Sequence, residues 1–430
     1  MNSPSDTESA LKRTVLPLIN LLINQVFRSR RDVLSGVLSL SKGLSKGAIH
    51  CSPSAGLFII AFATLTACNL PRSKPAPQLE AFAPAPPALD ISPDDLKTVI
   101  PRDAIPSITD PQFDNAPAAR AYMRPDEQIV GLILNGDVRA YPINILSRHE
   151  IVNDVVGGEP VAITWCPLCY SALVFSRRVN GKDLTFGVSG KLYQNNLIMY
   201  DHQTESLWSQ LLGQAVAGSS RGERLSLLTA VQTTWEDWRT EHPDTQVLSK
   251  PKTSNVFQGT SDAAESTYNY SVDPYQSYYA SEARGLVNRS VPEDTQVTAK
   301  RRILGLRLED QAKAYFFKAL ALQKAVNDSL AGVPVLVAFD AQSENGAAFD
   351  RRLDGRVLSF AVAGEGDRLL LRDQQTGSRW NGLAGQAVSG PMEGQQLRRL
   401  PATYAFWFAW KAHFPETQVY QQDALPAETP

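Results

Sequence analysis

Two cysteines separated by two residues form the pattern that points most directly to chemistry. Cys166-Pro167-Leu168-Cys169 follows a short apolar run, so we expect the pair at a chain reversal after a buried strand. If both thiols are reduced, they can point at one soft ion such as Cu(I) or Zn(II), because thiolates are preferred ligands of these ions. The same pair could instead exchange with disulfides or form an inert structural disulfide. The spacing alone leaves these three chemistries open.

Two histidines are candidates for completing a metal site. Apolar residues recur at helical spacing around His149, so we predict a helix from Ile143 to Val156, ended by Gly157-Gly158, with the imidazole on its apolar face. His202 follows the predicted strand LIMYD. The plainer alternatives are a hydrogen-bonded core histidine and a solvated turn. The candidate metal ligands are therefore Cys166, Cys169, His149 and His202, and the catalytic pair of a redox protein would be Cys166 and Cys169.

The residues around the cysteines bear on the redox alternative. Trp165-Cys-Pro-Leu-Cys resembles the Trp-Cys-x-x-Cys of thioredoxin-like oxidoreductases, in which a helix N-terminus lowers the pKa of the nucleophilic cysteine. Here Tyr170 to Phe175 is rich in residues typical of a strand, so we do not expect a helix after the pair.

An internal repeat provides a control for these assignments. Gly131–Gly190 aligns without a gap with Gly305–Gly364, and after a two-residue deletion the match resumes at Asp201 and Asp373. Residues found in both repeats need only a turn, cap or core role; they include Asn153, Asp154, Asp201, Thr204, Trp208, Gly213, Gly218, Trp235 and Trp238. The candidate ligands occur in the first repeat alone. The second repeat has Asp340 and Ser343 in place of Cys166 and Cys169, and Gln323 and Gln374 in place of His149 and His202. They require a separate explanation.

Each repeat contains more hairpin signals than crossover signals. Asn-Gly turns at 135–136 and 180–181 separate strand-like runs, and PVAITW and LIMYD are further predicted strands. We therefore expect an α+β fold of two tandem homologous domains, each mainly antiparallel sheet with one or two packing helices.

The N-terminal region reads as an export signal. The apolar run from Ala55 to Cys68 is too short to span a bilayer, Lys42 and Lys46 precede it, and Leu65-Thr66-Ala67-Cys68 resembles a bacterial lipobox. We expect lipidation of Cys68 and attachment to the membrane through this anchor. Asn69 favours the periplasmic face of the outer membrane over the inner membrane. The sequence does not decide between general secretion and twin-arginine export, nor does it fix the true translation start.

These signals and the repeat define the expected domain boundaries. We expect a leader at 1–67, a Pro/Ala-rich tether at 68–98, a first repeat domain at 99–250, a tyrosine-rich connecting segment at 251–297 that packs on a domain, and a second, degenerate repeat domain at 298–425. The net charge of −2 and the pI near 6.3 provide no basic field for a polyanion, so we expect no nucleic-acid partner.

Several longer stretches are similar to a known family. TWCPLCYSALVF, LTFGVSGKLYQNNLIMYDHQTESLWSQLLGQAVAG and DPYQSYY resemble the bacterial and archaeal family called domain of unknown function 3179, over about Ile100 to Val419. Members of that family are often exported, which the resemblance implies for this chain too. The family has no established activity, and the resemblance adds no mechanism.

We therefore expect an exported, lipid-anchored protein whose Cys-x-x-Cys site, assisted by His149 or His202, binds a soft metal such as copper or zinc. Two alternatives stay open at this point: a periplasmic thiol–disulfide redox protein, and a non-catalytic scaffold with a structural disulfide and no cofactor. The sequence does not decide whether the protein is an enzyme, and the partner is a metal ion or an unidentified protein.

Overall fold

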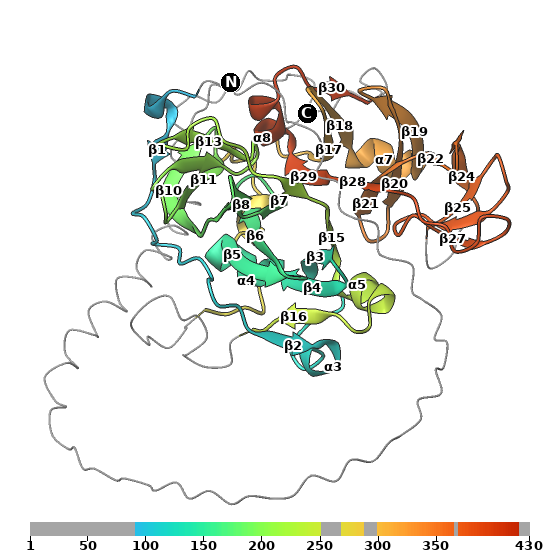
Figure 1. Ribbon diagram of the computed structural model, residues 1–430, viewed down its shortest axis with the longest axis horizontal. Helices are drawn as coiled ribbons and strands as arrows, with labels where there is room; N and C mark the ends of the chain where they lie inside the picture. Colours follow the sequence, from blue (N-terminus) through green and yellow to red (C-terminus); the bar gives the residue numbers. More distant parts are fainter. Residues whose placement is uncertain (1–90, 251–267, 288–298, 365–368, 421–430) are drawn as a thin grey trace, which may run out of the picture.

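The computed structural model describes residues 91–250, 268–287, 299–364 and 369–420 (Figure 1). We call residues 91–250 the first half, residues 299–420 the second half and residues 268–287 the connector. The predicted leader, Cys68 and most of the predicted tether lie outside the described residues, as do both ends of the predicted connecting segment. Within the described ranges, no helix is long and apolar enough to cross a membrane.

The first half combines short strands with helices of seven residues or fewer. Its elements are η1 (Pro93–Asp95), β1 (Lys97–Thr98), β2 (Phe113–Asn115), α3 (Ala116–Ala119), β3 (Gln128–Leu134), β4 (Asp137–Pro142), α4 (Ile143–His149), β5 (Ile151–Val156), β6 (Glu159–Cys166), β7 (Ser171–Ser176), β8 (Arg178–Val179), β9 (Lys182–Asp183), β10 (Phe186–Tyr193), β11 (Asn196–Asp201), β12 (Leu207–Ser209), β13 (Gln214–Ala217), β14 (Leu227–Leu228), β15 (Ala230–Thr234), α5 (Trp235–Glu241) and β16 (Gln246–Leu248).

These strands form three main sheets and a small hairpin. Their orders are β15-β3-β4-β16-β2, β14-β7-β6-β5 and β1-β10-β11-β12-β13, with β8 and β9 paired separately. Neighbours are antiparallel except β16 and β4. Asn135 and Asn180 have φ values of 50° and 49°, and each precedes a glycine with positive φ, as the two-residue hairpin turns require. The predictions of mainly antiparallel sheet and of hairpins at these two turns are confirmed.

The second half repeats the order of elements from β3 to β16. Its elements are β17 (Arg302–Leu308), β18 (Gln311–Phe316), α7 (Phe317–Gln323), β19 (Ala325–Leu330), β20 (Val333–Asp340), β21 (Asn345–Asp350), β22 (Arg352–Leu353), β23 (Arg356–Val357), β24 (Phe360–Val362), β25 (Leu370–Asp373), β26 (Arg379–Asn381), β27 (Gln386–Ser389), β28 (Arg399–Leu400), β29 (Ala402–Phe406), α8 (Trp407–His413) and β30 (Gln418–Val419). Its sheets are β29-β17-β18-β30, β19-β20-β21-β28 and β24-β25-β26-β27, with β22 and β23 paired separately.

Side-chain contacts recur at matching positions of the two halves. The Trp208 indole N–H donates to Asp201 and the Trp380 indole N–H donates to Asp373, both at 2.9 Å. A Cβ added at Gly131 would lie 2.4 Å from the Trp238 ring, and one at Gly305 would lie 2.4 Å from the ring of Trp410. The recurring tryptophans are therefore core residues in both halves, as the repeat predicts.

Part of the hydrophobic core belongs to both halves. One cluster packs the two cysteines of the first half with Phe406 and Phe408, and another packs Ile198 of β11 with Trp407 of α8. Strand β29 also contacts β7, and β15 contacts β21, so the two halves meet along these strands (Figure 1). Because the core crosses the predicted boundary, the division into two tandem domains stays a prediction.

The predicted helix from Ile143 to Val156 is wrong beyond His149. Helix α4 ends there because Glu150 adopts a left-handed conformation, with φ of 57°, and the chain continues as strand β5. Gly157 and Gly158 form the β5–β6 turn and do not end a helix. The apolar spacing was that of a short helix followed directly by a buried strand.

The connector packs on the first half through aromatic side chains. It contains the short helix α6 (Gln276–Tyr279), and Tyr270 and Tyr278 are 4% and 0% exposed. For the described part of the tyrosine-rich segment, the prediction that it packs on a domain is confirmed.

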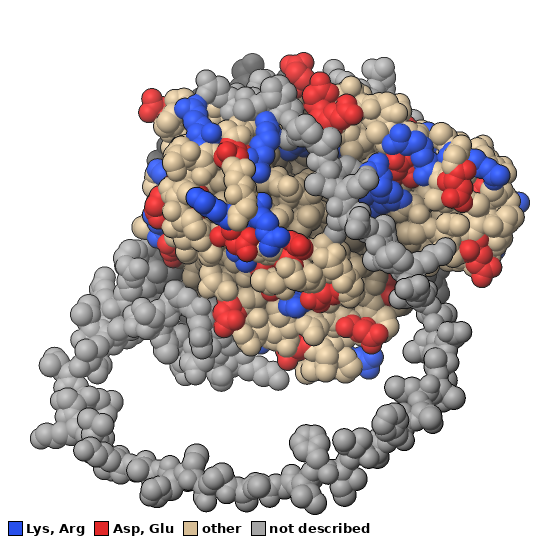
Figure 2. Space-filling view, viewed as in Figure 1, with Lys and Arg blue, Asp and Glu red and all other residues tan. Residues whose placement is uncertain are grey.

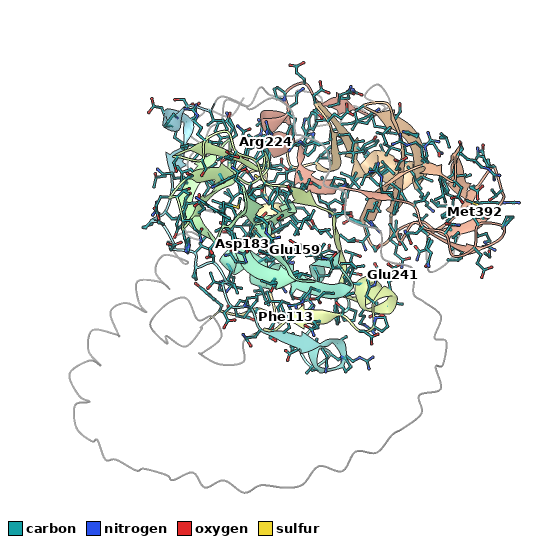
Figure 3. The ribbon with its side chains drawn as sticks, viewed as in Figure 1. Phe113, Glu159, Asp183, Arg224, Glu241 and Met392 are labelled. Carbon is teal, nitrogen blue, oxygen red and sulfur yellow. The ribbon has the colours of Figure 1, made fainter. Side chains whose placement is uncertain are left out.

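Charged side chains of both signs are interspersed on the face shown in Figure 2. Arg178, for example, pairs with Glu159 at 3.2 Å and with Asp183 at 3.1 Å, and Figure 3 labels both carboxylates. Exposed pairs of this kind are screened by solvent and contribute little to stability. Burial of the apolar clusters is therefore the main stabilising contribution in this fold.

Candidate functional site

The two cysteines lie in the tight connection between β6 and β7. The Cys169 N–H donates to the Cys166 carbonyl at 3.1 Å, which closes a four-residue turn, and Tyr170 then adopts a left-handed φ of 56°. A turn followed by one left-handed residue is a common hairpin connection. Strand β7 follows at once, so the prediction of a strand after the pair is confirmed.

The turn brings both sulfur atoms to one buried polar position. Each thiol is within reach of the Asn195 carbonyl oxygen, with Sγ–O distances of 3.8 Å for Cys166 and 3.2 Å for Cys169. The Asn196 side-chain amide donates to Cys169 Sγ at 3.7 Å. Both cysteines are free thiols, with exposed fractions of 2% and 0%. We call these two cysteines, with Glu150, Asn195 and Asn196, the dithiol site.

The two thiols have opposite acidities. Burial by itself would raise the pKa of Cys166, but hydrogen bonds from the Cys169 thiol, from the Leu197 and Cys169 backbone N–H groups and from Asn196 together lower it below its usual value. Burial raises the pKa of Cys169 well above its usual value, and the hydrogen bond to Cys166 and the charge on that residue raise it further. Cys166 is therefore the more acidic thiol of the pair, and Cys169 holds its proton more tightly.

Glu150 is a buried carboxyl group beside this pair. It ends α4, and its carbonyl accepts a 2.8 Å hydrogen bond from the backbone N–H of Trp165, the residue before the first cysteine. Burial raises the pKa of Glu150 well above its usual value, and the charge on Cys166 raises it further. Glu150 in turn raises the pKa of Cys169. Glu150 therefore interacts electrostatically with both cysteines and holds its own proton to higher pH than an ordinary glutamate.

A chain of buried polar side chains extends from the sulfur atoms into the first half. The Asn196 amide donates to Gln210 Oε1 at 2.8 Å, and Gln210 Nε2 donates to the Thr164 hydroxyl and the Ser171 carbonyl, both at 3.1 Å. The Ser171 hydroxyl also donates to Gln210 Oε1, at 3.2 Å. These four residues are buried, and this network fixes the side-chain amide that contacts Cys169.

The connector and the second half cover the turn that carries the cysteines. The Tyr278 hydroxyl donates to the Leu168 carbonyl at 2.9 Å, and the Phe406 backbone N–H donates to the Cys169 carbonyl at 2.8 Å. The Asn195 side-chain oxygen accepts hydrogen bonds from the Leu286 and Val287 N–H groups of the connector. The dithiol site is therefore enclosed by segments that lie far from it in the sequence.

The structure places neither predicted histidine at the sulfur atoms. Both ring nitrogens of His149 have other hydrogen-bond partners at 2.8 Å: Nδ1 contacts the Pro106 carbonyl and Nε2 contacts the Tyr270 hydroxyl. Burial lowers the pKa of His149 to about 4, so its imidazole is neutral at pH 7. His202 is exposed and stacks on Tyr200. In the described part of the chain, no three His, Cys, Asp or Glu residues form a group that could hold a metal.

Residues of the dithiol site other than the cysteines were missed by the sequence analysis. Two signals were available in the repeat, because the counterpart of Glu150 is Lys324 and that of Gln210 is Gly382. Asn195 and Asn196 fall beside the two-residue deletion, so the second repeat offered no clear counterpart. The covering residues Tyr278 and Phe406 carried no local signal, since only the fold brings them to the turn.

Comparison with known proteins agrees with the resemblance drawn from the sequence. The family model described as protein of unknown function (DUF3179) matches residues 102–417, a single match that spans both halves and the connector. No curated protein and no solved structure matches the chain. Since the matched region covers most of the sequence and contains the whole dithiol site, the chain belongs to the DUF3179 family.

Proposed function

We propose that this protein carries out thiol–disulfide exchange at Cys166 and Cys169, with a small disulfide as its co-reactant. The observation that carries the proposal is a pair of buried thiols at one turn that both contact the Asn195 carbonyl, with the pKa of Cys166 lowered by hydrogen bonds and that of Cys169 raised by burial. An exchange reaction needs one thiolate to attack and a second thiol to resolve the mixed disulfide. The enclosure of the sulfur atoms favours a small co-reactant over a folded protein.

The reaction balances with the groups at hand. The Cys166 thiolate attacks one sulfur of a disulfide RSSR, a Cys166–SR bond forms, the RS–SR bond breaks and RS⁻ leaves. Cys169 then gives its proton to the Glu150 carboxylate, and its sulfur attacks Cys166 Sγ, which forms the Cys166–Cys169 disulfide and releases the second RS⁻. Two electrons pass from the dithiol to RSSR; the proton that Cys169 gave to Glu150 and a second proton from solvent convert both RS⁻ ions to RSH. The raised pKa of Glu150 makes its carboxylate, once ionised, a stronger base than that of an ordinary glutamate.

The test is equilibration of the purified full chain with reduced and oxidised glutathione, followed by alkylation of the free thiols. Peptide mapping then assigns each modified cysteine, because the chain also contains Cys51 and Cys68. We expect a reversible Cys166–Cys169 disulfide. Its reduction potential should lie above about −300 mV, whereas structural disulfides lie below that value. Cys169→Ser should accumulate a mixed disulfide at Cys166, whereas Cys166→Ser should form none. A bridge that resists dithiol reductants, or the opposite behaviour of the two variants, would contradict the proposal.

Binding of a soft metal is the second candidate function. Two sulfur atoms directed at one point are a chemically suitable donor pair for Cu(I), and this is the observation in its favour. Among the described residues, no third His, Cys, Asp or Glu completes a metal site with this pair. We therefore rank metal binding second. Anaerobic titration of the reduced chain with Cu(I) or Zn(II) separates the two functions: retention of metal above a Cys166→Ser/Cys169→Ser control would support this candidate.

We also propose that the chain is a duplication of one α+β unit and that it is exported and lipidated at Cys68. The paired tryptophan–aspartate contacts and the matching order of elements support the duplication. The apolar run before Cys68 supports export, with attachment at the periplasmic face of the outer membrane. The mass of the N-terminal peptide from membranes tests the anchor, since a diacylated or triacylated Cys68 is expected and an unmodified peptide would contradict it.

A further inference from the structure

The dithiol site is closed to solvent, since Cys166 and Cys169 are 2% and 0% exposed. Thiol–disulfide exchange requires that a sulfur atom of the co-reactant reach the attacking thiol. A segment that covers the sulfur atoms must therefore move during the reaction. Two segments from outside the first half cover the cysteine turn, strand β29 and the connector, and they are attached to the rest of the fold in different ways.

Strand β29 and the first part of the connector are firmly attached. Strand β29 pairs with β17 along its whole length, from Ala402 to Phe406, so its movement would break a sheet of the second half. Residues 268–273 of the connector are bound to helix α4, because the Tyr270 hydroxyl contacts His149 Nε2 at 2.8 Å and Tyr270 is 4% exposed. Neither of them can uncover the sulfur atoms without disrupting the core.

The rest of the connector, residues 275–287, is attached through side chains; we call it the α6 segment. The Tyr278 hydroxyl donates to the carbonyl of Leu168, which lies between the cysteines, at 2.9 Å and accepts from the Gly285 N–H at 3.0 Å. The segment contains one four-residue helix, and within the described ranges it pairs with no strand. Its release would break a few hydrogen bonds and leave every described sheet intact.

Asn195 joins the α6 segment to the sulfur atoms. Its side-chain oxygen accepts hydrogen bonds from the Leu286 and Val287 N–H groups at 2.7 and 2.6 Å, and its backbone carbonyl lies 3.2 Å from Cys169 Sγ. A Cβ added at Gly285 would lie 2.3 Å from the Asn195 side chain. The α6 segment is therefore in direct contact with the dithiol site.

Lys300 holds the α6 segment against the fold. The neighbouring carbonyl of Ala299 accepts a 2.9 Å hydrogen bond from the Phe408 N–H, which fixes the backbone here to the second half. The Lys300 ammonium donates to the Tyr278 carbonyl, to the Ser281 carbonyl at 2.9 Å and to the Ser281 hydroxyl at 3.2 Å. It also lies 3.4 Å from the centre of the Tyr278 ring, a favourable position for a cation.

We propose that the α6 segment is a lid over the dithiol and that Lys300 is the latch that keeps it closed. Opening of the lid admits the small disulfide to Cys166, so the inference rests on the proposed function and adds the route of access. Local opening of a segment with few backbone attachments costs less free energy than global unfolding. The structure shows the closed state, in which the thiols are protected.

The test is the rate at which iodoacetamide alkylates Cys166 and Cys169 in the reduced, folded full chain at pH 7, with peptide mapping. Lys300→Met removes the three hydrogen bonds of the ammonium and should raise both rates at least about tenfold. Tyr278→Phe keeps the ring, removes the hydroxyl and should raise them about threefold or more. Loss of a positive charge does not make a thiol more acidic, so faster alkylation of Lys300→Met reports access.

Lys411→Met is the matched control. Lys411 also donates to a backbone carbonyl, that of Pro415 at 2.6 Å, and lies 5.9 Å from the centre of the Trp407 ring, but it makes no described contact with the α6 segment. Its replacement should leave both alkylation rates unchanged. Low concentrations of urea separate the lid from global unfolding, because opening of the lid exposes little surface and its rate should change little with urea.

Three results would overturn the lid. They are alkylation rates that stay the same in Lys300→Met and Tyr278→Phe, rates that rise as much in Lys411→Met, and rates that increase with urea as steeply as global unfolding does. Alkylation requires no disulfide co-reactant, so these results leave the glutathione equilibration of the proposed function untouched. A chain that opens as expected but forms no reversible disulfide would contradict the proposed function and not the lid.

Discussion

The connection between β6 and β7 and its counterpart between β20 and β21 both end in a residue of left-handed conformation, but their surroundings differ. Tyr170 and Glu344 both adopt left-handed conformations, with φ of 56° and 53°. The two cysteines and the residues between them are buried, whereas the second connection is exposed at Ala341 and Gln342. The turn therefore does not need a cover to form. Within the described ranges, the connector and Phe406 contact the connection that carries the thiols, so this cover distinguishes the two connections.

The helix ends before the two connections support the same conclusion. Glu150 and Lys324 both follow a seven-residue helix with φ near 58°, and each carbonyl accepts a 2.8 Å hydrogen bond from the strand that leads to the turn. The backbone is retained while an acid is replaced by a base. Glu150 interacts electrostatically with both cysteines, whereas the turn beside Lys324 carries Asp340 and Ser343 in their place. Four predictions test this comparison, from the largest expected effect to the smallest.

Replacement of the paired tryptophans should be equally damaging in both halves. Trp208 and Trp380 are 0% and 1% exposed, and each packs edge-on against a phenylalanine. Trp208→Ala and Trp380→Ala should each lower the free energy of unfolding by about 3–5 kcal/mol. Because the halves share apolar clusters, denaturant unfolding should follow one transition in each variant. Two separate transitions, with only one shifted in each variant, would show instead that the halves are independent domains.

Gln210→Ala should affect the first half alone. The change leaves the Asn196 amide without its Gln210 partner and removes two bonds to Ser171, so we expect a loss of about 1–3 kcal/mol in unfolding free energy. It should also change the alkylation rate of Cys169, which that amide contacts. Gln342→Ala, on the exposed second connection, is the control and should be close to neutral. If Gln210→Ala and Gln342→Ala lowered the free energy of unfolding equally, the buried network around Gln210 would contribute no more to stability than an exposed glutamine does.

The sequence predicted the hairpins and the cysteine pair, but it did not predict the end of α4 or the contact of Phe406 with the turn. The reasons for these differences are physical. Asn-Gly turns encode their conformation locally, so the hairpins at 135–136 and 180–181 were predicted correctly. The end of α4 was not, because a glutamate in a left-handed conformation gives no signal and the following valines fit either element. The cysteines were found by their spacing. Phe406 was not found, since a contact with Cys169 across the two halves leaves no local pattern.

Glu150→Gln should change the pH dependence of stability. A carboxyl whose folded pKa is raised contributes stability that is fully present below its unfolded pKa, near 4.5, and is lost as the pH rises through the folded value. The glutamine variant lacks this loss, so its stability relative to the original chain should increase by about 1.4 kcal/mol per pH unit above pH 4.5, until the folded pKa is reached. Denaturant unfolding from pH 4 to pH 9 measures this difference.

The thiols provide the second readout for Glu150. Its charge raises the pKa of Cys169, so Glu150→Gln should shift the alkylation of Cys169 to lower pH. The matched control is Lys324→Gln, which changes the same position of the second half, and it should leave the alkylation of both cysteines unchanged. An alkylation profile that does not move in Glu150→Gln would separate this carboxyl from the dithiol chemistry.

The smallest effect is expected at a turn that both halves share. The Thr204 hydroxyl donates to Asp201 at 2.7 Å, and the Thr376 hydroxyl donates to Asp373 at 2.8 Å, in the β11–β12 and β25–β26 turns. Thr204→Ala and Thr376→Ala should each cost about 1 kcal/mol, measured by denaturant unfolding. Because the turns have no hydrogen-bond partner in common, the double variant should lose the sum of the two values. Unequal single costs, or a strongly non-additive double variant, would mean that one turn has a role beyond the shared fold, and the duplication would then no longer serve as an internal control.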